Sequence, residues 1–304
     1  MKEKAFSPGH ITGFFQICDE AKDPLMKGSR GAGLSVSNGV TTTVEISPAS
    51  KTEIHIEING NASLPAPVSE GVISKYLELD PQNNREIFVT HEVNLPIGCG
   101  FGTSGAGALS LSLALNESLN LGLTRIRAAQ IAHTVEVELR TGLGTVIAET
   151  VGGIEIRTFA GGPGVGQIET LPASNDYMVV CLPFGPISTA HYLKDEPTRQ
   201  RINDRGGLLT DALRGHPTVE NFLDYSRHFA EYIQIITSRV RTVLQKADEA
   251  GFKCSTAIFG ENVFSLVRPE RVKKLVTIFS KHKESEYDVL VMNVDWEGAR
   301  VLNE

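Results

Sequence analysis

The sequence predicts an α+β protein of two domains, and three observations support this prediction. The chain has 304 residues, a length that favours two domains over one. Its second half is patterned as strand, helix, strand, strand, helix, strand, which is the order of the ferredoxin-like unit. Its first half places strand segments and glycine clusters before two helical segments. We place the boundary in the turn-rich stretch 160–175, with an N-terminal domain over 1–165 and a C-terminal domain over 166–304.

The elements of the first half are predicted from hydrophobic periodicity. Alternation of apolar and polar residues indicates strands, whereas a run rich in Ala and Leu indicates a helix. Thr124 is expected to cap a second helix, because a Thr side chain accepts hydrogen bonds from the free N–H groups of a first helical turn. The predicted strands are 41–46, 52–58, 85–93 and 152–159, and the predicted helices are 106–119 and about 125–140.

The second half has a clearer order of elements. A buried strand is predicted over 176–183, followed by a long helical region that ends near Gly251. Two strands joined by a short turn come next, then a helix with Pro269 near its start, then a last strand. The paired strands are 254–259 and 262–267, the helix is 268–283 and the last strand is 287–294.

Composition and charge exclude several classes of protein. The chain has 29 Lys and Arg against 36 Asp and Glu, a net charge of −7, whereas binding to nucleic acid relies on concentrated cations. No apolar stretch approaches the roughly 18 residues that a membrane span needs, and the first residues contain no apolar secretion signal. The four cysteines are widely separated, as in reduced thiols. We therefore expect a soluble, cytoplasmic protein without nucleic-acid or membrane partners.

The strongest functional signal is a glycine-rich segment between a predicted strand and a predicted helix. Alternating glycines let backbone N–H groups point into one concavity, because no Cβ blocks the approach. A helix that begins near Ser104 adds unpaired amides and the positive end of its dipole, which predicts a phosphate site. The alternative is a glycine-rich turn that allows close helix packing. The candidate ATP-binding residues are Pro96, Gly98, Gly100, Gly102, Thr103, Ser104, Gly105 and Gly107.

A second candidate site lies on the predicted helix 125–140. His133 and Glu136 are three residues apart and therefore share a face of the helix. A carboxylate beside a phosphate loop can hold Mg²⁺, which prefers carboxylate and phosphate oxygens, and the Ser104 hydroxyl could bind the same ion. The alternative is an exposed ion pair between Glu136 and Arg140, four residues apart, and the spacing leaves both open.

Two further segments place cations among glycines or apolar residues. Lys27 and Arg30 lie in the glycine-rich stretch 27–33, which predicts either a loop that receives an anion or a solvated surface turn. Arg157 alternates with apolar residues in a predicted strand. If it faces a cleft, its planar guanidinium suits a substrate carboxylate, and the alternative is a solvated face of the sheet.

Three motifs resemble, in the same order, those of the GHMP kinases, the superfamily of galacto-, homoserine, mevalonate and phosphomevalonate kinases. SPGHITGFF is similar to their first motif, and PIGCGFGTSGAGALS is similar to their phosphate-binding second motif. CSTAIFGENVFSL takes the place of the third, although it is poorer in glycine than in most members. Within the superfamily, AHTVEVELRTGLG, GGIEIR and HPTVENFLDYSRHFAE resemble the family of archaeal pantoate kinases.

This resemblance implies a fold, a reaction and residue roles. The fold is the two-domain GHMP kinase fold, with an ATP-binding, ribosomal-S5-like N-terminal domain and a ferredoxin-like C-terminal α/β sandwich. The reaction transfers the γ-phosphate of ATP to the primary hydroxyl of pantoate, giving 4-phosphopantoate, a step toward coenzyme A. Matched motif by motif, Ser104 and Glu136 hold Mg²⁺ and ATP. The residues implied to contact pantoate are Ser29, His133 and Arg157, with Arg30 as a further contact. Members are often homodimers.

One catalytic position departs from the family pattern. After T-G-L-G the family usually has Asp, where many GHMP kinases place a catalytic acid, and this chain has Thr145. Phosphoryl transfer depends mostly on positioning and charge, so the base could be dispensable. Glu149, one helical turn further on, could instead substitute for it. Two alternatives to pantoate phosphorylation therefore stay open: a kinase for another branched hydroxy acid, such as mevalonate or its phosphate, and a non-catalytic nucleotide-binding protein.

Overall fold

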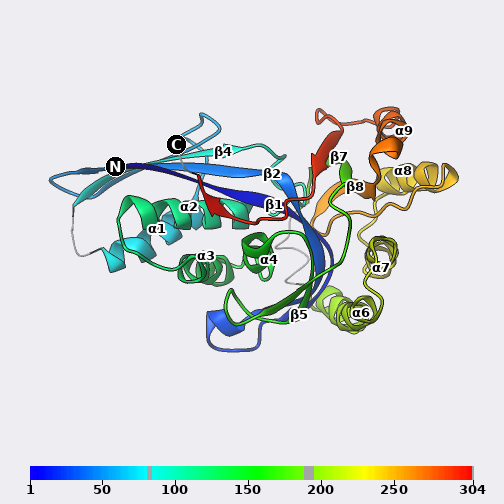
Figure 1. Cartoon of the computed structure of the whole chain (residues 1–304), viewed down its shortest axis with the longest axis horizontal. Coiled ribbons are helices and arrows are strands. Elements are labelled where there is room, and N and C mark those ends of the chain that lie inside the picture. The colour runs from blue at the N-terminus through cyan, green and yellow to red at the C-terminus, as the bar shows by residue number, and fades with distance from the viewer. Residues whose placement is uncertain (81–83, 188–194, 303–304) are drawn as a thin grey trace.

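Two β-sheets, each covered by helices, make up the computed structural model, which describes residues 1–80, 84–187 and 195–302 (Figure 1). The first sheet contains β1 (Lys2–Cys18), β2 (Gly28–Pro48), β3 (Glu53–Ile58), β4 (Arg85–Val93), β5 (Ile154–Phe159), β6 (Gln167–Thr170) and β10 (Arg300–Val301). The second contains β7 (Met178–Pro186), β8 (Gly260–Val267) and β9 (Leu290–Asn293). The helices are η1 (Pro24–Met26), α1 (Pro67–Leu79), α2 (Thr103–Ser118), α3 (Arg125–Leu139), α4 (Thr145–Val151), α6 (Glu196–Gly215), α7 (Val219–Tyr232), α8 (Ser238–Glu249) and α9 (Pro269–Ser280).

Helices α1, α2 and α3 cover one face of the first sheet, and α2 packs against β1, β2 and both neighbouring helices (Figure 1). Most residues of α2 are buried, because the small residues along it (Ala, Ser and Gly) let the neighbouring elements approach closely. The Thr124 hydroxyl accepts a hydrogen bond from Arg127 N at 3.2 Å, which confirms the predicted cap of α3. The start of α2 is therefore held firmly at the edge of a packed layer.

The first half differs from the prediction in two long strands, β1 and β2. The sequence predicts no strand in β1 and only 41–46 of β2, yet the two pair along nearly their whole length. Both alternatives predicted for 27–33, a loop that receives an anion and a solvated surface turn, are therefore wrong, because β2 starts at Gly28 and most of its first residues are buried. Backbone pairing in this long hairpin outweighs the weak strand propensity of glycine. A glycine is also needed at position 33 because of a close neighbour: a Cβ there would lie 2.4 Å from Nε2 of His10.

The second sheet has the strand order β8-β7-β9, with α6, α7 and α8 after β7 and α9 after β8. The strand predicted over 254–259 is reduced to one antiparallel bridge, between Ser255 and Phe264 of β8. Phe259 has a left-handed backbone, with φ 63°, which interrupts the extended run. The bridge lies on the free side of β8, where a ferredoxin-like sheet places its second strand. The ferredoxin-like architecture is therefore confirmed, with one strand nearly lost.

Two short strands from the second half belong to the first sheet. β6 pairs with β5, and β10 pairs with β1 at Ala5–Val301 and Phe6–Arg300. Residues on both sides of the predicted boundary thus contribute to one sheet. The position of the boundary at 165/166 stays a prediction.

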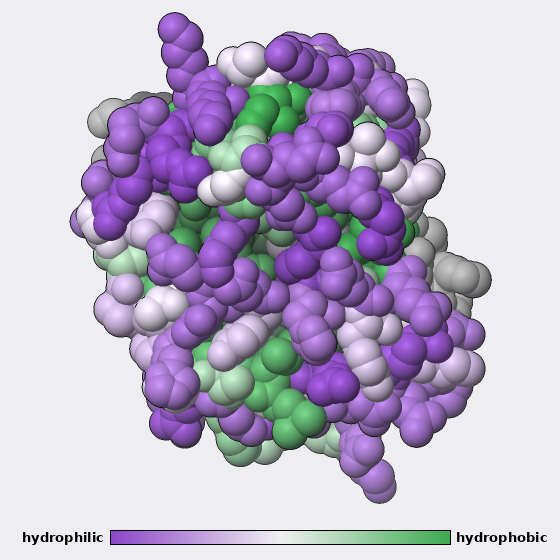
Figure 2. Space-filling model, turned by 90° about the vertical axis from the view of Figure 1, so that its right-hand side faces the viewer, coloured by the Kyte–Doolittle hydropathy of each residue, from purple (hydrophilic) through white to green (hydrophobic). Residues whose placement is uncertain are grey.

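The surface over α6 to α9 is largely hydrophilic, and hydrophobic side chains show there only as separate patches (Figure 2). Within the described ranges, no helix combines the length and the apolar character needed to span a membrane.

A buried group of hydrogen-bonded polar side chains, centred on His91, should make the free energy of unfolding depend on pH. His91 of β4 is 3% exposed; Thr42 Oγ1 lies 2.8 Å from its Nδ1 and Ser69 Oγ lies 3.0 Å from its Nε2. Burial lowers the pKa of His91 to about 4. A histidine titrates near 6.5 in the unfolded chain, which therefore binds more protons as the pH falls. Stability should be complete above about pH 6.5 and lost progressively toward pH 4.

The measurement is urea unfolding of the wild type and of His91→Gln at about pH 7 and about pH 4.5. We expect the wild type to lose roughly 2 kcal/mol more than the variant over this interval. Equal losses would show that His91 does not carry this pH dependence.

Candidate active site

A pocket lies where the first sheet meets the starts of α2 and α4 and the segment before β8. Its walls come from β1, β2 and β5, from the loop 97–102 and the first residues of α2, and from Thr141 to Thr145. Ile258 and Phe259 complete it from the second half of the chain. Both halves therefore contribute side chains to one site.

The glycine-rich loop before α2 lines this pocket. Gly98, Gly100 and Gly102 have φ angles of 79°, 88° and 63°, a left-handed conformation that glycine adopts without strain. α2 begins at Thr103 with no side-chain cap, so the N–H groups of its first turn have no partner inside the helix. Gly102, Thr103 and Ser104 line the pocket, so the positive end of the helix dipole lies at its wall, as an anion site requires.

The structure divides the predicted ATP-binding residues into two groups. Those on the pocket wall are Gly98, Gly100, Gly102, Thr103 and Ser104, whereas Pro96, Gly105 and Gly107 are not part of the wall. Gly105 and Gly107 lie inside α2, and a Cβ at Gly105 would lie 2.9 Å from Oε2 of Glu149 on α4. Close packing, the alternative that the sequence leaves open, therefore also applies. It extends to the loop, where a Cβ at Gly102 would lie 2.6 Å from Cγ2 of Thr145, but not to Gly107, where a Cβ would meet nothing within 4 Å.

Glu136 of α3 lies beside the start of α2; it is not part of the pocket wall but contacts Ser104, which is. Its Oε1 accepts hydrogen bonds from the hydroxyls of Ser104 and Thr141, both at 2.6 Å. The side chain is 1% exposed, and burial raises its pKa although the two hydroxyls lower it. Oxygen ligands and an incompletely compensated negative charge fit a hard cation such as Mg²⁺. The alternative of an exposed ion pair with Arg140 is wrong, since Glu136 is buried and Arg140 ends α3 in a left-handed conformation.

Ser29 and Arg157 form another wall of the pocket, on the paired strands β2 and β5. Both are buried, so the solvated alternative for Arg157 is wrong. Arg157 Nη1 donates to Glu155 Oε1, while Arg157 Nε has no partner among the described residues. A Cβ at Gly144 would lie 2.1 Å from the Ser29 hydroxyl and 3.1 Å from Arg157 Nε, so these two donors flank the same glycine. A hydroxyl and an unpaired guanidinium N–H together suit a carboxylate.

Arg30 and His133 do not reach the pocket wall. Arg30 points toward α6, where it pairs with Asp211. His133 is buried beside η1, and its Nε2 lies 3.2 Å from Pro24 O and 3.1 Å from Lys27 O. Two carbonyl acceptors require the proton on Nε2, and burial lowers the pKa of His133, which favours the neutral ring. His133 thus holds the segment that leads into β2, and its effect on the pocket is indirect.

Thr145 is the first residue of α4 and lines the pocket, whereas Glu149 lies one turn behind it. Glu149 is fully buried, and neither of its carboxyl oxygens has a hydrogen-bond partner in the described part of the chain. Burial and the nearby charges of Glu136 and Glu155 raise its pKa well above the usual value, which disfavours the ionised form that a base needs. The suggestion that Glu149 substitutes for the missing Asp is therefore not supported.

The second half of the chain holds the phosphate loop through β8. Asn262 Nδ2 donates to Cys99 O at 2.7 Å, and Asn262 Oδ1 accepts from Ala257 N at 2.9 Å. Gly260 permits this approach, since a Cβ there would lie 2.1 Å from Cys99 O. The third motif has a single glycine, and it stands where the two halves meet.

His10 and Thr12 of β1 also line the pocket, and the sequence assigns them no individual role. The available signal is the first motif itself, in which these polar residues alternate with apolar ones. Without β1 in the prediction, that alternation could not be assigned to a face.

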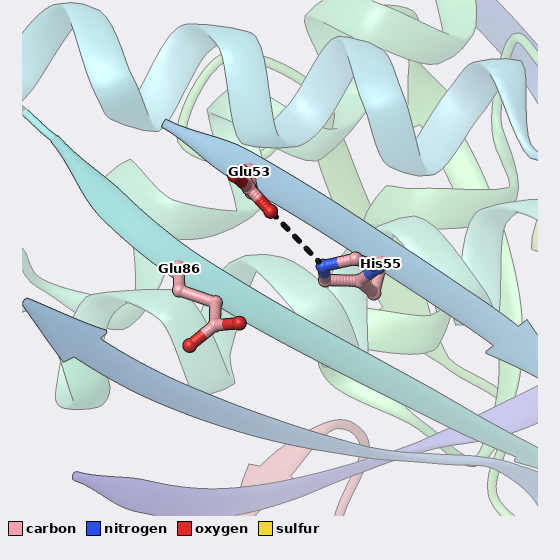
Figure 3. A group of neighbouring side chains, drawn as sticks. All are labelled: Glu53, His55 and Glu86. Atoms are coloured by element: carbon pink, nitrogen blue, oxygen red, sulfur yellow. Dashed lines mark ion pairs between the residues drawn. The ribbon is translucent and has the colours of Figure 1, made fainter. Parts of the chain in front are cut away.

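One group of possible metal ligands lies outside the pocket, on β3 and β4: Glu53, His55 and Glu86 (Figure 3). Their ligand atoms lie within 4.8 Å of one another, and the His55 ring stacks on Phe88 at 4.5 Å. His55 is exposed and the two carboxylates are partly so, which allows water to solvate all three. We assign no metal to this group.

Comparisons with known proteins agree with this geometry. Residues 70–153 match the model of the GHMP kinases N-terminal domain. The chain is 35% identical to a pantoate kinase of Thermococcus kodakarensis, over 99% of this chain and 96% of that protein. It is 32% identical to a pantoate kinase of Methanocaldococcus jannaschii, over 90% of this chain and 96% of that protein.

Comparison with solved structures also points to the GHMP kinase fold. A phosphotransferase related to the coenzyme A biosynthesis pathway superposes with a TM-score of 0.89 at 31% identity, covering 99% of this chain and 98% of that one. A homoserine kinase of Cytophaga hutchinsonii shares the fold, with a TM-score of 0.73 at 17% identity over 99% and 97% of the two chains. The chain belongs to the pantoate kinase family of the GHMP kinases and is a phosphotransferase with an alcohol acceptor.

Proposed function

We propose that this protein transfers the γ-phosphate of ATP to the primary hydroxyl of pantoate, giving 4-phosphopantoate. One observation carries the proposal: a single pocket combines an uncapped helix start with the buried pair Ser29 and Arg157. The helix start suits a polyphosphate, and the buried pair suits a carboxylate. Full-length relatives named pantoate kinase support the identity of the acceptor.

Each part of the pocket has a separate role in this reaction. The glycine loop and the first amides of α2 bind the ATP phosphates. Ser104 and Glu136 would hold Mg²⁺, which neutralises charge on the transferring phosphoryl group when it is bound. Ser29 and Arg157 hold the acceptor carboxylate and so orient its hydroxyl. A cytoplasmic location and a homodimer remain predictions.

A coupled ADP-release assay tests the proposal. Pantoate, pantothenate, mevalonate and homoserine are supplied in parallel with ATP, with and without Mg²⁺. We expect release with pantoate only, dependent on Mg²⁺, and a phosphate ester on the primary carbon by phosphorus NMR. Release with mevalonate and none with pantoate would assign another hydroxy acid. ATP binding without release for any acceptor would indicate a non-catalytic nucleotide-binding protein.

Restoring an acid at position 145 should reveal coupling between Thr145 and Glu149. At the position of a Cβ on Gly102, Thr145 Cγ2 would lie 2.6 Å away and Glu149 Oε1 2.8 Å away, so the two side chains are close neighbours. Thr145→Asp therefore brings two carboxyl groups together, and one must stay protonated. We expect Thr145→Asp to lose roughly tenfold in kcat, and the double variant with Glu149→Gln to regain it. Additive effects in this double-mutant cycle would contradict the coupling.

A further inference from the structure

A chain of hydrogen bonds runs along the pocket wall from Thr12 to Arg157. Thr12 Oγ1 lies 3.3 Å from His10 Nδ1, and His10 Nε2 lies 2.9 Å from Glu155 Oε1. The same carboxylate oxygen accepts a hydrogen bond from Arg157 Nη1. Thr12, His10 and Arg157 line the pocket, and Glu155 is fully buried behind them.

The backbone arrangement of three strands explains why these hydrogen bonds form. His10 and Thr12 are alternate residues of β1, so their side chains leave the same face. In β2, Gly33 pairs with Thr12 on one side and with Glu155 of β5 on the other. Because Gly33 has no Cβ, the His10 ring can cross β2 and reach Glu155.

The partners fix where the protons lie. Glu155 forms an ion pair with Arg157 and is a carboxylate, which can only accept hydrogen bonds. His10 Nε2 therefore carries the proton, and Nδ1 is the acceptor of the ring. The Thr12 hydroxyl then donates to Nδ1, which leaves the lone pairs of Thr12 Oγ1 free to accept a proton from the pocket.

This chain lies between the two ligand-binding parts of the pocket. His10 N donates to Phe101 O of the phosphate loop at 2.8 Å, while its ring is linked through Glu155 to Arg157. An acceptor whose carboxylate binds at Arg157 must place its hydroxyl between that residue and the phosphate loop. Among the described side chains of the pocket wall, His10 is the one with a ring nitrogen or a carboxylate that can accept a proton.

We propose that Thr12 and His10 remove the proton of the acceptor hydroxyl during phosphoryl transfer, with Glu155 as a positioning residue. This rests on the proposed function, in which that hydroxyl attacks the γ-phosphorus. The acceptor proton moves to Thr12 Oγ1 while the Thr12 proton moves to His10 Nδ1. The new oxygen–phosphorus bond forms as the bond from the γ-phosphorus to its bridging oxygen breaks, and that electron pair leaves with ADP. Glu155 stabilises the imidazolium, which returns its proton to solvent after product release.

Proton removal by Thr12 and His10 would explain how phosphoryl transfer proceeds without a carboxylate at position 145, where Thr145 lines the pocket and Glu149 is buried behind it. General-base help of this kind is typically worth about 10²- to 10⁴-fold in rate.

Thr12→Val is the direct test, because valine keeps the shape of threonine and removes the hydroxyl. We expect kcat to fall about 10²- to 10⁴-fold, with the KM values for pantoate and ATP within about threefold of the wild type. Thr12→Ser restores a hydroxyl and should keep kcat within about tenfold of the wild type. Thermal melting shows whether each variant is folded.

Thr42→Val is the matched control. It breaks the same kind of bond, between a threonine hydroxyl and Nδ1 of a buried histidine, here His91 at 2.8 Å, outside the pocket. We expect a lower melting temperature and an unchanged kcat. A purely structural effect of Thr12→Val would follow this control and lower stability without a selective loss of kcat.

Glu155→Gln provides a second measurement, since glutamine can still accept from His10 but cannot stabilise the imidazolium by charge. We expect kcat to fall at least about tenfold without a rise in the pantoate KM, because Arg157 is freed from its ion pair. The proposal is overturned if Thr12→Val keeps kcat within threefold, or if only the pantoate KM changes. A wild type that phosphorylates none of the acceptors would instead overturn the proposed function.

Discussion

Glu136→Gln is expected to lower kcat at least about 100-fold while the protein stays folded. In the proposed function Glu136 is the charged ligand of Mg²⁺, and the loss of such a ligand removes several kcal/mol of transition-state stabilisation. The variant keeps an amide oxygen for the hydroxyls of Ser104 and Thr141, which lie 2.6 Å from Glu136 Oε1. Because burial raises the pKa of Glu136, its ionised form costs folding free energy, so the neutral variant should melt at the same or a higher temperature. The measurements are kcat over a Mg²⁺ titration and thermal melting.

Glu138→Gln is the control on the same helix. Glu138 is two residues further along α3, its side chain is 45% exposed, and it pairs with Lys75 at 3.5 Å. Removing its charge should change neither kcat nor the Mg²⁺ dependence. Unaltered kinetics in Glu136→Gln would remove Glu136 from the metal site, and a loss of kcat together with a lower melting temperature would point to a structural role.

Arg157→Lys is expected to raise the pantoate KM about 10- to 100-fold and to leave the ATP KM within about threefold. Arg157 uses one nitrogen for Glu155, and its Nε, next to Ser29, has no partner within the described residues. Lysine preserves the positive charge for Glu155 but lacks the second, fixed donor, and a hydrogen bond to a charged group is worth about 1.5–3 kcal/mol. Lysine is preferable to alanine here, because Arg157→Ala would leave a buried carboxylate unpaired and cost about 3–5 kcal/mol of stability.

Arg30→Lys is the matched control for Arg157→Lys. Arg30 is on the neighbouring strand β2, but its guanidinium pairs with Asp211 and donates to Thr158 O at 3.0 Å, outside the pocket. The pantoate KM should therefore stay within about threefold of the wild type. Equal rises in the pantoate and ATP KM values of Arg157→Lys would show that Arg157 acts through the fold instead of through the carboxylate.

The phosphate loop could be predicted from the sequence because its chemistry is local. Gly98, Gly100, Gly102 and the helix that begins at Thr103 are adjacent along the chain, and their backbone angles follow from the glycines themselves. The partnership of Ser104 with Glu136 joins two such segments, and helix periodicity indicated the face of Glu136. What the spacing left open was whether that face is buried.

The other walls of the pocket depend on strand pairing between distant segments. His10 and Glu155 are 145 positions apart, and they meet because Gly33 of β2 stands between their strands. Glycine-rich strands have weak local signals, so β1 and most of β2 could not be recognised before their pairing was known. The motif match likewise suggested Arg30 and His133 as contacts, but their strand and helix faces direct them away from the pocket.

By itself, the sequence determined the α+β class, the glycine loop with its helix, and the resemblance to GHMP kinases, because each depends on residues close together in the chain. Only the tertiary structure decided which charges are buried and which residues share the pocket wall. Burial sets the pKa of Glu149 well above its usual value, and Arg157 Nε has no partner in the part of the chain that the structure describes; neither property can be read from spacing. The physical reason is that desolvation and hydrogen-bond pairing depend on the neighbours that the fold supplies, not on the neighbours in sequence.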